Sequence, residues 1–218
     1  VLLPLFSLMV VGCEDNAETD TDNATEDTLQ QDPQSDTGPW EKDGIRLSEF
    51  TDFNEVSGVT IDLEEPETLD GIEPGEKTFR FNVEGFELGV VTEGADQTGL
   101  ANSADGQHIH FILNNKPYMA HYEPEFTATL GSEDFVMLAF PSRSYHLSVK
   151  GPYVLEAFST NGAEPNFDVN APHLFYSRPK GEYNGADAET ILLDFYLVNT
   201  DLSQDGHKVR VTVNGNTQ

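Results

Sequence analysis

The chain has 218 residues, of which 39 are acidic and 11 basic, so its formal net charge is −28. Such a charge repels a phosphate backbone, and we expect no nucleic-acid partner. A single cysteine cannot form an internal disulfide, so a packed core must hold the folded part together.

The first segment, residues 1–13, reads VLLPLFSLMVVGC. Twelve uncharged residues are too few to cross a bilayer as a helix, which needs about 20, but they match the core of a signal peptide. The residues Val10-Val11-Gly12-Cys13 resemble the lipobox of bacterial lipoproteins, with valine where leucine is usual. This resemblance implies a partial lipoprotein signal peptide that ends at a lipidated Cys13. A plain secretory signal and a buried strand are the alternatives.

The second segment, residues 14–39, has nine acidic residues and no basic ones. Leu29 is its only large apolar residue, so the segment cannot bury enough surface to become ordered, and we expect a disordered tether. Acidic residues directly after the cysteine resemble the export signal of lipoproteins in Bacteroidetes-type bacteria. The resemblance implies an outer-membrane protein, held to the membrane by its lipid and facing the periplasm or the cell surface.

Residues 40–218 show the patterns of β-strands. Alternating apolar and polar residues occur in GVTIDL, TFRFNV and KVRVTV, at residues 58–63, 78–83 and 208–213. Continuous apolar runs, which are typical of central strands, occur in FVMLAF and ILLDFYLV, at residues 135–140 and 191–198. Asp-Gly and Asn-Gly pairs between these runs favour tight turns. We predict one all-β domain, an antiparallel β-sandwich of immunoglobulin-like or cupredoxin-like topology.

Two segments depart from this pattern. Residues 142–150, SRSYHLSVK, do not alternate, so a short helix from Ser142 to Lys150, closed by Gly151, is expected. The chain ends in VRVTVNGNTQ, a strand with an Asn-Gly hairpin signal and no evident return strand. We therefore expect the natural protein to continue, with the sandwich lacking its last strands here.

A short span, GQHIHFILNNKPYMAH at residues 106–121, holds three of the six histidines. In an extended strand, His108 and His110 lie on one face, turned away from the face that carries the larger apolar residues. Two such imidazoles can bind one metal ion at about 2.0–2.1 Å. A hairpin can bring Met119 and His121 near them. Imidazole with thioether favours a transition metal, copper before zinc, over calcium or magnesium.

The histidines can also be ordinary strand residues. His-x-His pairs are common on exposed strand faces, and Met119 can be a core residue. His146 and His173 can complete or replace the set, and spacing does not choose between them. A blue-copper centre is excluded because it needs a thiolate, and the only cysteine, Cys13, is assigned to the lipid.

A second candidate site consists of two Ser-Arg pairs beside tyrosines. Paired guanidinium groups with nearby hydroxyls can bind the carboxylate or phosphate of an anionic peptide, phosphopeptide or glycan. The alternative is that each arginine pairs with an acidic residue on a neighbouring strand. The residues are Arg143, Arg178, Ser142, Ser177, Tyr145 and Tyr176.

Several segments of the chain resemble two groups of bacterial proteins. TIDLEEPETLDGIEPGEKTFRFNVEGFELG and NSADGQHIHFILNNKPY are similar to a family of secreted domains of unknown function with a G-H-H-H-[LI]-L-[IV]-D strand. His108 and His110 match that motif, while Gln107 and Asn114 depart from it. GQHIHFILNNKPYMAHYEPEF, LAFPSRSYHLSVK and APHLFYSRPKGEY are similar to Bacteroidetes-type lipoproteins, some of which are named phosphopeptide-binding protein.

Sequence signatures of enzymes are missing. The chain has no Gly-x-Ser-x-Gly elbow, no His-Glu-x-x-His motif and no phosphate-binding glycine loop. We therefore expect a non-catalytic binding module of the cell envelope. A structural or adhesive surface protein without a small ligand is a third alternative.

Overall fold

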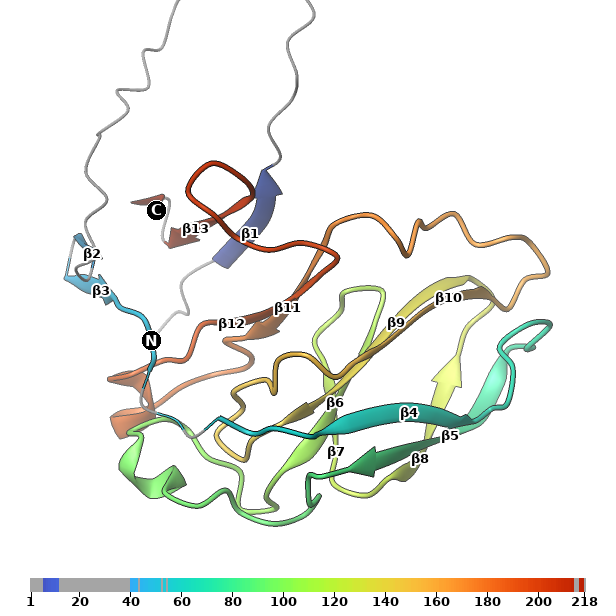
Figure 1. Ribbon diagram of the computed structural model, residues 1–218, viewed down its shortest axis with the longest axis horizontal. Coiled ribbons are helices and arrows are strands. Elements are labelled where there is room, and N and C mark those ends of the chain that lie inside the picture. Colours follow the sequence, from blue (N-terminus) through green and yellow to red (C-terminus); the bar gives the residue numbers. More distant parts are fainter. Residues whose placement is uncertain are drawn as a thin grey trace, which may run out of the picture. The chain divides into compact units, whose positions relative to one another are not determined.

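The computed structural model describes residues 6–11, 40–42, 44–51, 53, 55–213 and 216–217 (Figure 1). Its strands belong to two compact units, one formed mainly by Asn54–Thr200 and the other by Pro4–Phe53 together with Asp201–Gln218. Within the described ranges, no helix has the length and apolar character needed to cross a membrane.

The larger unit consists of antiparallel sheets, and the predicted all-β antiparallel sandwich is confirmed. The first sheet has the order β4 (Thr60–Glu65), β5 (Gly75–Glu84), β8 (Glu125–Leu130). The second has the order β10 (Val154–Ser159), β9 (Asp134–Ser142), β6 (His108–Leu113), β7 (Met119–His121). The third pairs β11 (His173–Arg178) with β12 (Asp194–Val198). Short 3₁₀ helices, η1 (Ala95–Gln97) and η2 (Gly185–Ala188), lie in the connections.

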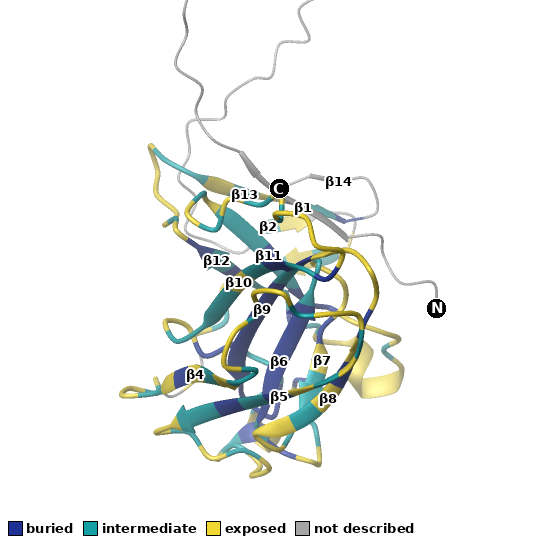
Figure 2. Cartoon of the chain, turned by 90° about the vertical axis from the view of Figure 1, so that its right-hand side faces the viewer, coloured by how far each residue is buried: buried dark blue, intermediate teal, exposed yellow. Residues whose placement is uncertain are grey.

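The two central strands of the second sheet, β6 and β9, are buried on both faces, as their dark blue in Figure 2 shows. On one face, Ile109 and Phe111 of β6 pack in a core with Phe79 and Phe81 of β5. On the other face, Ile112 packs in a second core to which β11 and β12 contribute. Burial on both faces explains why FVMLAF is continuously apolar, since a central strand has no solvated side.

The smaller unit contains β1 (Phe6–Val11), β13 (Lys208–Val213) and β14 (Asn216–Thr217), with β13 paired to both others. It also contains a hairpin of β2 (Trp40–Lys42) and β3 (Ile45–Leu47). The expectation that no return strand follows Val213 is wrong, because β14 returns directly after the Asn-Gly pair.

Part of the predicted signal-peptide core, Phe6–Val11, forms a strand, which is one of the two alternatives to a signal peptide. Cys13 and the predicted tether at 14–39 lie outside the described residues. The division into signal peptide, tether and domain therefore stays a prediction.

The predicted helix between Ser142 and Lys150 is wrong. Ser142 ends β9 and forms an antiparallel bridge with Ser148, and the backbone N–H of Arg143 donates to the carbonyl of Leu147 at 3.0 Å. The backbone groups of this segment are thus satisfied by a tight turn that folds back on β9. A lack of alternation indicated correctly that it is no regular strand, but it gave no sign of the turn.

Candidate metal centre

Three histidines converge in the larger unit, two from β6 and one from the turn after β9. The Nε2 atoms of His108 and His110 are 3.0 Å apart, and Nδ1 of His146 lies 3.2 Å from Nε2 of His108. One ring nitrogen of each imidazole lies within 4.8 Å of the others. Among the described residues, this cluster contains no carboxylate or thiolate.

The spacing of these nitrogens suits a shared metal ion. Two ligands at about 2.0–2.1 Å from a tetrahedral metal lie about 3.3–3.4 Å from each other. Two of the three separations, 3.0 and 3.2 Å, are slightly shorter than this, and the third pair of nitrogens lies within 4.8 Å, so metal binding would require the rings to adjust.

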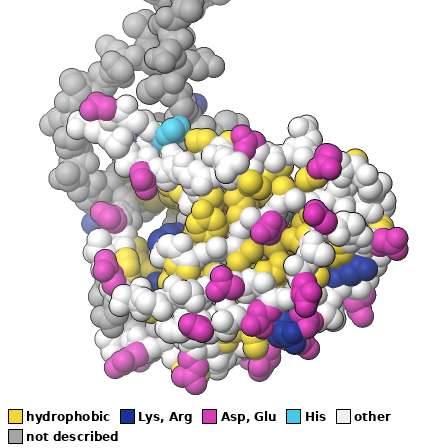
Figure 3. Space-filling model, turned by 45° about the vertical axis from the view of Figure 1, so that its right-hand side comes forward, with side chains coloured by type: hydrophobic (Ala, Val, Ile, Leu, Met, Phe, Trp, Pro, Cys, Tyr) yellow, Lys and Arg dark blue, Asp and Glu magenta, His cyan; other side chains and the backbone are white. Residues whose placement is uncertain are grey.

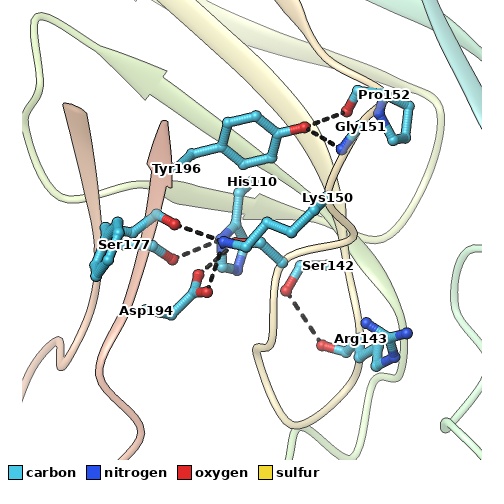
Figure 4. Close-up of polar contacts among 11 residues, drawn as sticks. His110, Ser142, Arg143, Lys150, Gly151, Pro152, Ser177, Asp194 and Tyr196 are labelled. Atoms are coloured by element: carbon cyan, nitrogen blue, oxygen red, sulfur yellow. Dashed lines mark hydrogen bonds and ion pairs between the residues drawn. The ribbon is translucent and has the colours of Figure 1, made fainter. Parts of the chain in front are cut away.

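Contacts on the outer side of the His108 and His110 rings favour tautomers whose inner nitrogens can act as ligands. Nδ1 of His108 lies 2.8 Å from the carbonyl oxygen of Gly106, which only accepts, so Nδ1 carries the proton and Nε2 carries the lone pair. Nδ1 of His110 lies 3.2 Å from the hydroxyl of Ser177, which can donate or accept (Figure 4). When Nδ1 of His110 donates to that hydroxyl, its Nε2 carries the lone pair that metal binding requires.

His146 reaches the cluster from a residue with an unusual backbone conformation. Its φ is +68°, a left-handed conformation that histidine adopts more often than most residues other than glycine. Its N–H donates to the carbonyl of Arg143 at 2.8 Å, which closes the turn. Ser144 exchanges hydrogen bonds with Thr92, each backbone N–H donating to the other's hydroxyl at 3.0 Å. The left-handed residue is thus held by contacts within the turn and beside it.

The loop before β6 requires a glycine. Gly106 has a φ of +93°, and a Cβ atom there would lie 2.6 Å from backbone atoms of Gly89 and Val90. The N–H of Gln107 donates to the carbonyl of Val90, and the N–H of Gly89 donates to the carbonyl of Gln107, both at 2.8 Å. This close backbone approach fixes the carbonyl of Gly106 that orients His108.

Burial keeps the three imidazoles neutral. It lowers the pKa of His108 to about 4 and that of His146 to about 3, and it holds the pKa of His110 well below the ordinary value of 6.5. Nearby Arg178 and Lys180 lower all three pKa values further, while the hydrogen bond to the carbonyl of Gly106 opposes the shift at His108. A neutral imidazole is the form that binds a metal.

His108 and His110 lie on the face of β6 opposite Ile109 and Phe111, but it is not the exposed face that the alternative interpretation assumed. Both have an exposed fraction of 0%, because β11 and β12 cover the face of β6 on which they lie. The ring of Tyr118 stacks on His110 with centroids 3.6 Å apart, and the centroid of the Tyr122 ring lies 5.0 Å from that of His108. The histidines sit among aromatic rings, yet their inner nitrogens still converge.

Met119 and His121 do not join the cluster. They pair in register with Phe111 and Ile109, so on β7 they lie on the face opposite to His110, whose register partner is Ala120. His121 instead stacks on Phe126 with ring centroids 3.4 Å apart, and Met119 is 39% exposed. The predicted hairpin forms, but Ala120, and not Met119 or His121, lies on the face of β7 that it shares with His110.

His173, the other alternative third histidine, stacks on Phe167 with centroids 4.2 Å apart. Its Nε2 lies 2.6 Å from the carbonyl of Asp168. His146 therefore supplies the third imidazole. Spacing did not select it, because 38 residues separate it from His108.

The two Ser-Arg pairs occupy different surroundings. Ser142 donates to the carbonyl of Arg143, whose side chain extends away from His110 in Figure 4, and Asp194 interacts electrostatically with Arg143. Arg178 donates to the hydroxyl of Tyr183 at 2.8 Å, and Ser177 contacts His110. Of the remaining residues predicted for this site, Tyr145 is buried and the Tyr176 hydroxyl donates to the carbonyl of Pro179.

Arg178 and Lys180 lie beside the histidines, which the sequence did not indicate. The guanidinium carbon of Arg178 and the ammonium of Lys180 lie 5.4 and 4.1 Å from the centroid of the Tyr118 ring. The Tyr118 hydroxyl is 3.4 Å from Nδ1 of His146. Burial raises the pKa of Tyr118, so its phenol stays protonated. Two positively charged side chains and the phenol hydroxyl of Tyr118 therefore lie at the edge of the histidine cluster.

A scan against protein-family models, a search of curated proteins and a search of solved structures each found no match. The resemblance to secreted domains of unknown function and the expectation of an immunoglobulin-like or cupredoxin-like topology therefore stay predictions.

Proposed function

We propose that this protein binds one transition-metal ion through His108, His110 and His146, as a non-catalytic module. The observation that carries the proposal is the convergence of three neutral imidazoles, two buried and one partly buried, on one point. A net charge of −28 favours this role, because it concentrates cations near the protein. Acidic side chains are spread over the face displayed in Figure 3.

The donor set suits zinc and copper alike. A preference for copper depends on the thioether of Met119, which lies on the opposite face of the sheet from His110. Three imidazoles by themselves bind Zn²⁺ or Cu²⁺ and are poor ligands for Ca²⁺ or Mg²⁺. We therefore propose zinc or copper, with no order between them.

Equilibrium dialysis of the purified protein against Zn²⁺, Cu²⁺ and Cu⁺ tests this proposal. About one ion per chain is expected for zinc or copper, and none for the His108→Ala, His110→Ala double variant. Circular dichroism shows whether the double variant keeps its β-structure. Unchanged stoichiometry in a folded double variant would rule out the site.

We also propose that the protein is lipid-anchored at Cys13 and works at the outer membrane. The support is the sequence alone: an apolar run, the lipobox-like residues and an acidic segment after the cysteine. In a bacterial host that processes lipoproteins, labelled palmitate should enter the full-length precursor and should be lost in Cys13→Ser. Labelling that persists in Cys13→Ser would contradict the anchor.

A further inference from the structure

We propose that the metal held by His108, His110 and His146 takes an oxyanion, a carboxylate or phosphate group, as a further ligand, and that Arg178 binds the same anion. This inference rests on the proposed metal site. It assigns to that site a ligand class and a second recognition group.

The coordination number leaves room for such a ligand. Three protein ligands leave an open position on zinc or copper, which an exogenous ligand or water fills. Within the described part of the chain, the cluster offers no carboxylate to fill it. The open position would therefore take a ligand that the cluster itself does not supply.

The charge of the site favours an anion at that position. A divalent ion at the cluster would add two positive charges beside Arg178 and Lys180, which already disfavour protonation of all three histidines. Burying like charges together is costly unless a counter-charge accompanies them. An anionic ligand supplies that counter-charge, whereas a water molecule does not.

Arg178 has a hydrogen-bond donor to spare. The residue is only 8% exposed, and its Nε–H has no hydrogen-bond partner among the described residues, although a terminal nitrogen donates to Tyr183 at 2.8 Å. A buried N–H without a partner costs free energy, so its persistence suggests a missing acceptor. The planar edge of a guanidinium fits the two oxygens of a carboxylate or phosphate.

The Tyr118 ring connects the histidines with Arg178. Its hydroxyl is 3.4 Å from Nδ1 of His146, and its centroid is 5.4 Å from the guanidinium carbon of Arg178. Arg178 and His146 thus border the same ring, and the electrostatic effect of Arg178 on all three histidines agrees with a guanidinium beside the cluster. Because the protein is strongly acidic, we expect anion binding to depend on the metal.

Cobalt substitution separates the two proposals. The purified protein is loaded with Co²⁺, free metal is removed, and the visible absorption of the bound Co²⁺ reports its ligands. Acetate and inorganic phosphate are then titrated separately, so that the two anion classes are distinguished. At least one is expected to shift the spectrum with saturation. Arg178→Gln should keep the metal and bind the anion about 10- to 100-fold more weakly.

Arg80→Gln is the matched control, because Arg80 contacts Glu64, Glu65 and Glu125 outside the histidine cluster. It should leave the anion affinity unchanged. Arg178→Lys keeps the positive charge but loses the planar guanidinium edge, so it should also weaken anion binding, and it serves as the decisive variant if Arg178→Gln loses its metal.

The outcomes are distinct. Failure of the wild-type protein to retain Co²⁺, Zn²⁺ or copper overturns both proposals. Retained metal with no spectral response to either anion overturns only the oxyanion ligand. Equal anion affinities in the wild type and Arg178→Gln, or in the wild type and Arg178→Lys where that variant is decisive, overturn it as well.

Discussion

His146→Ala is expected to lower the affinity for Zn²⁺ by at least about 100-fold. The loss of a residue that only hydrogen-bonds to a metal ligand typically costs about 10- to 100-fold, and the loss of a ligand itself should cost more. The reason is that Nδ1 of His146 lies 3.2 Å from Nε2 of His108 and supplies the third inner nitrogen. Competition with a chromophoric chelator measures the change.

His121→Ala is the matched control for that variant. His121 is also a partly buried histidine, on β7 of the sheet that carries His108 and His110, but it stacks on Phe126 and lies on the opposite face from His110. It should leave the affinity within about threefold of the wild type, as should Met119→Ala. If His121→Ala loses the metal and His146→Ala keeps it, the proposed ligand set is wrong.

Acid is expected to destabilise the metal-free protein as the pH falls from about 6.5 toward about 4. The folded pKa values of His108 and His146, about 4 and about 3, lie below the ordinary value of 6.5. The unfolded chain therefore binds more protons in this interval, and the free energy of unfolding falls with the pH. Each neutral histidine contributes a slope of up to about 1.4 kcal/mol per pH unit.

Urea unfolding between pH 6.5 and 5 measures this effect while most carboxylates remain ionised. His146→Gln should make this pH dependence shallower, because glutamine takes up no proton when the chain unfolds, whereas His146 does. His121→Phe should do the same from outside the cluster, because burial also lowers the pKa of His121 to about 4. An unfolding free energy that stays flat in the wild type, or that falls as steeply in both variants as in the wild type, contradicts a histidine origin of the acid sensitivity.

Local patterns predicted the strands well because the direction of a side chain from a strand depends only on the two-residue repeat. The repeat placed His108 and His110 on one face, and FVMLAF marked a central strand. It did not show that this face is covered. The face that carries His108 and His110 is covered by β11 and β12, which lie more than 60 residues further along the chain.

Pairing register explains the error at Met119 and His121. Two residues that are two positions apart share a face, but the register of the hairpin determines which face of the sheet that is. Here β7 pairs so that Ala120 meets His110, and a shift by one residue would have brought Met119 and His121 to the cluster side. Sequence spacing does not determine this register.

The sequence by itself determined the all-β class, the shared face of His108 and His110, and the strongly acidic charge, because each follows from local period or composition. Only the tertiary structure decided that the imidazoles are buried, that His146 joins them and that Arg178 borders them. Those facts depend on a turn and on strands from distant parts of the chain, whose packing also creates the low polarity that keeps the histidines neutral.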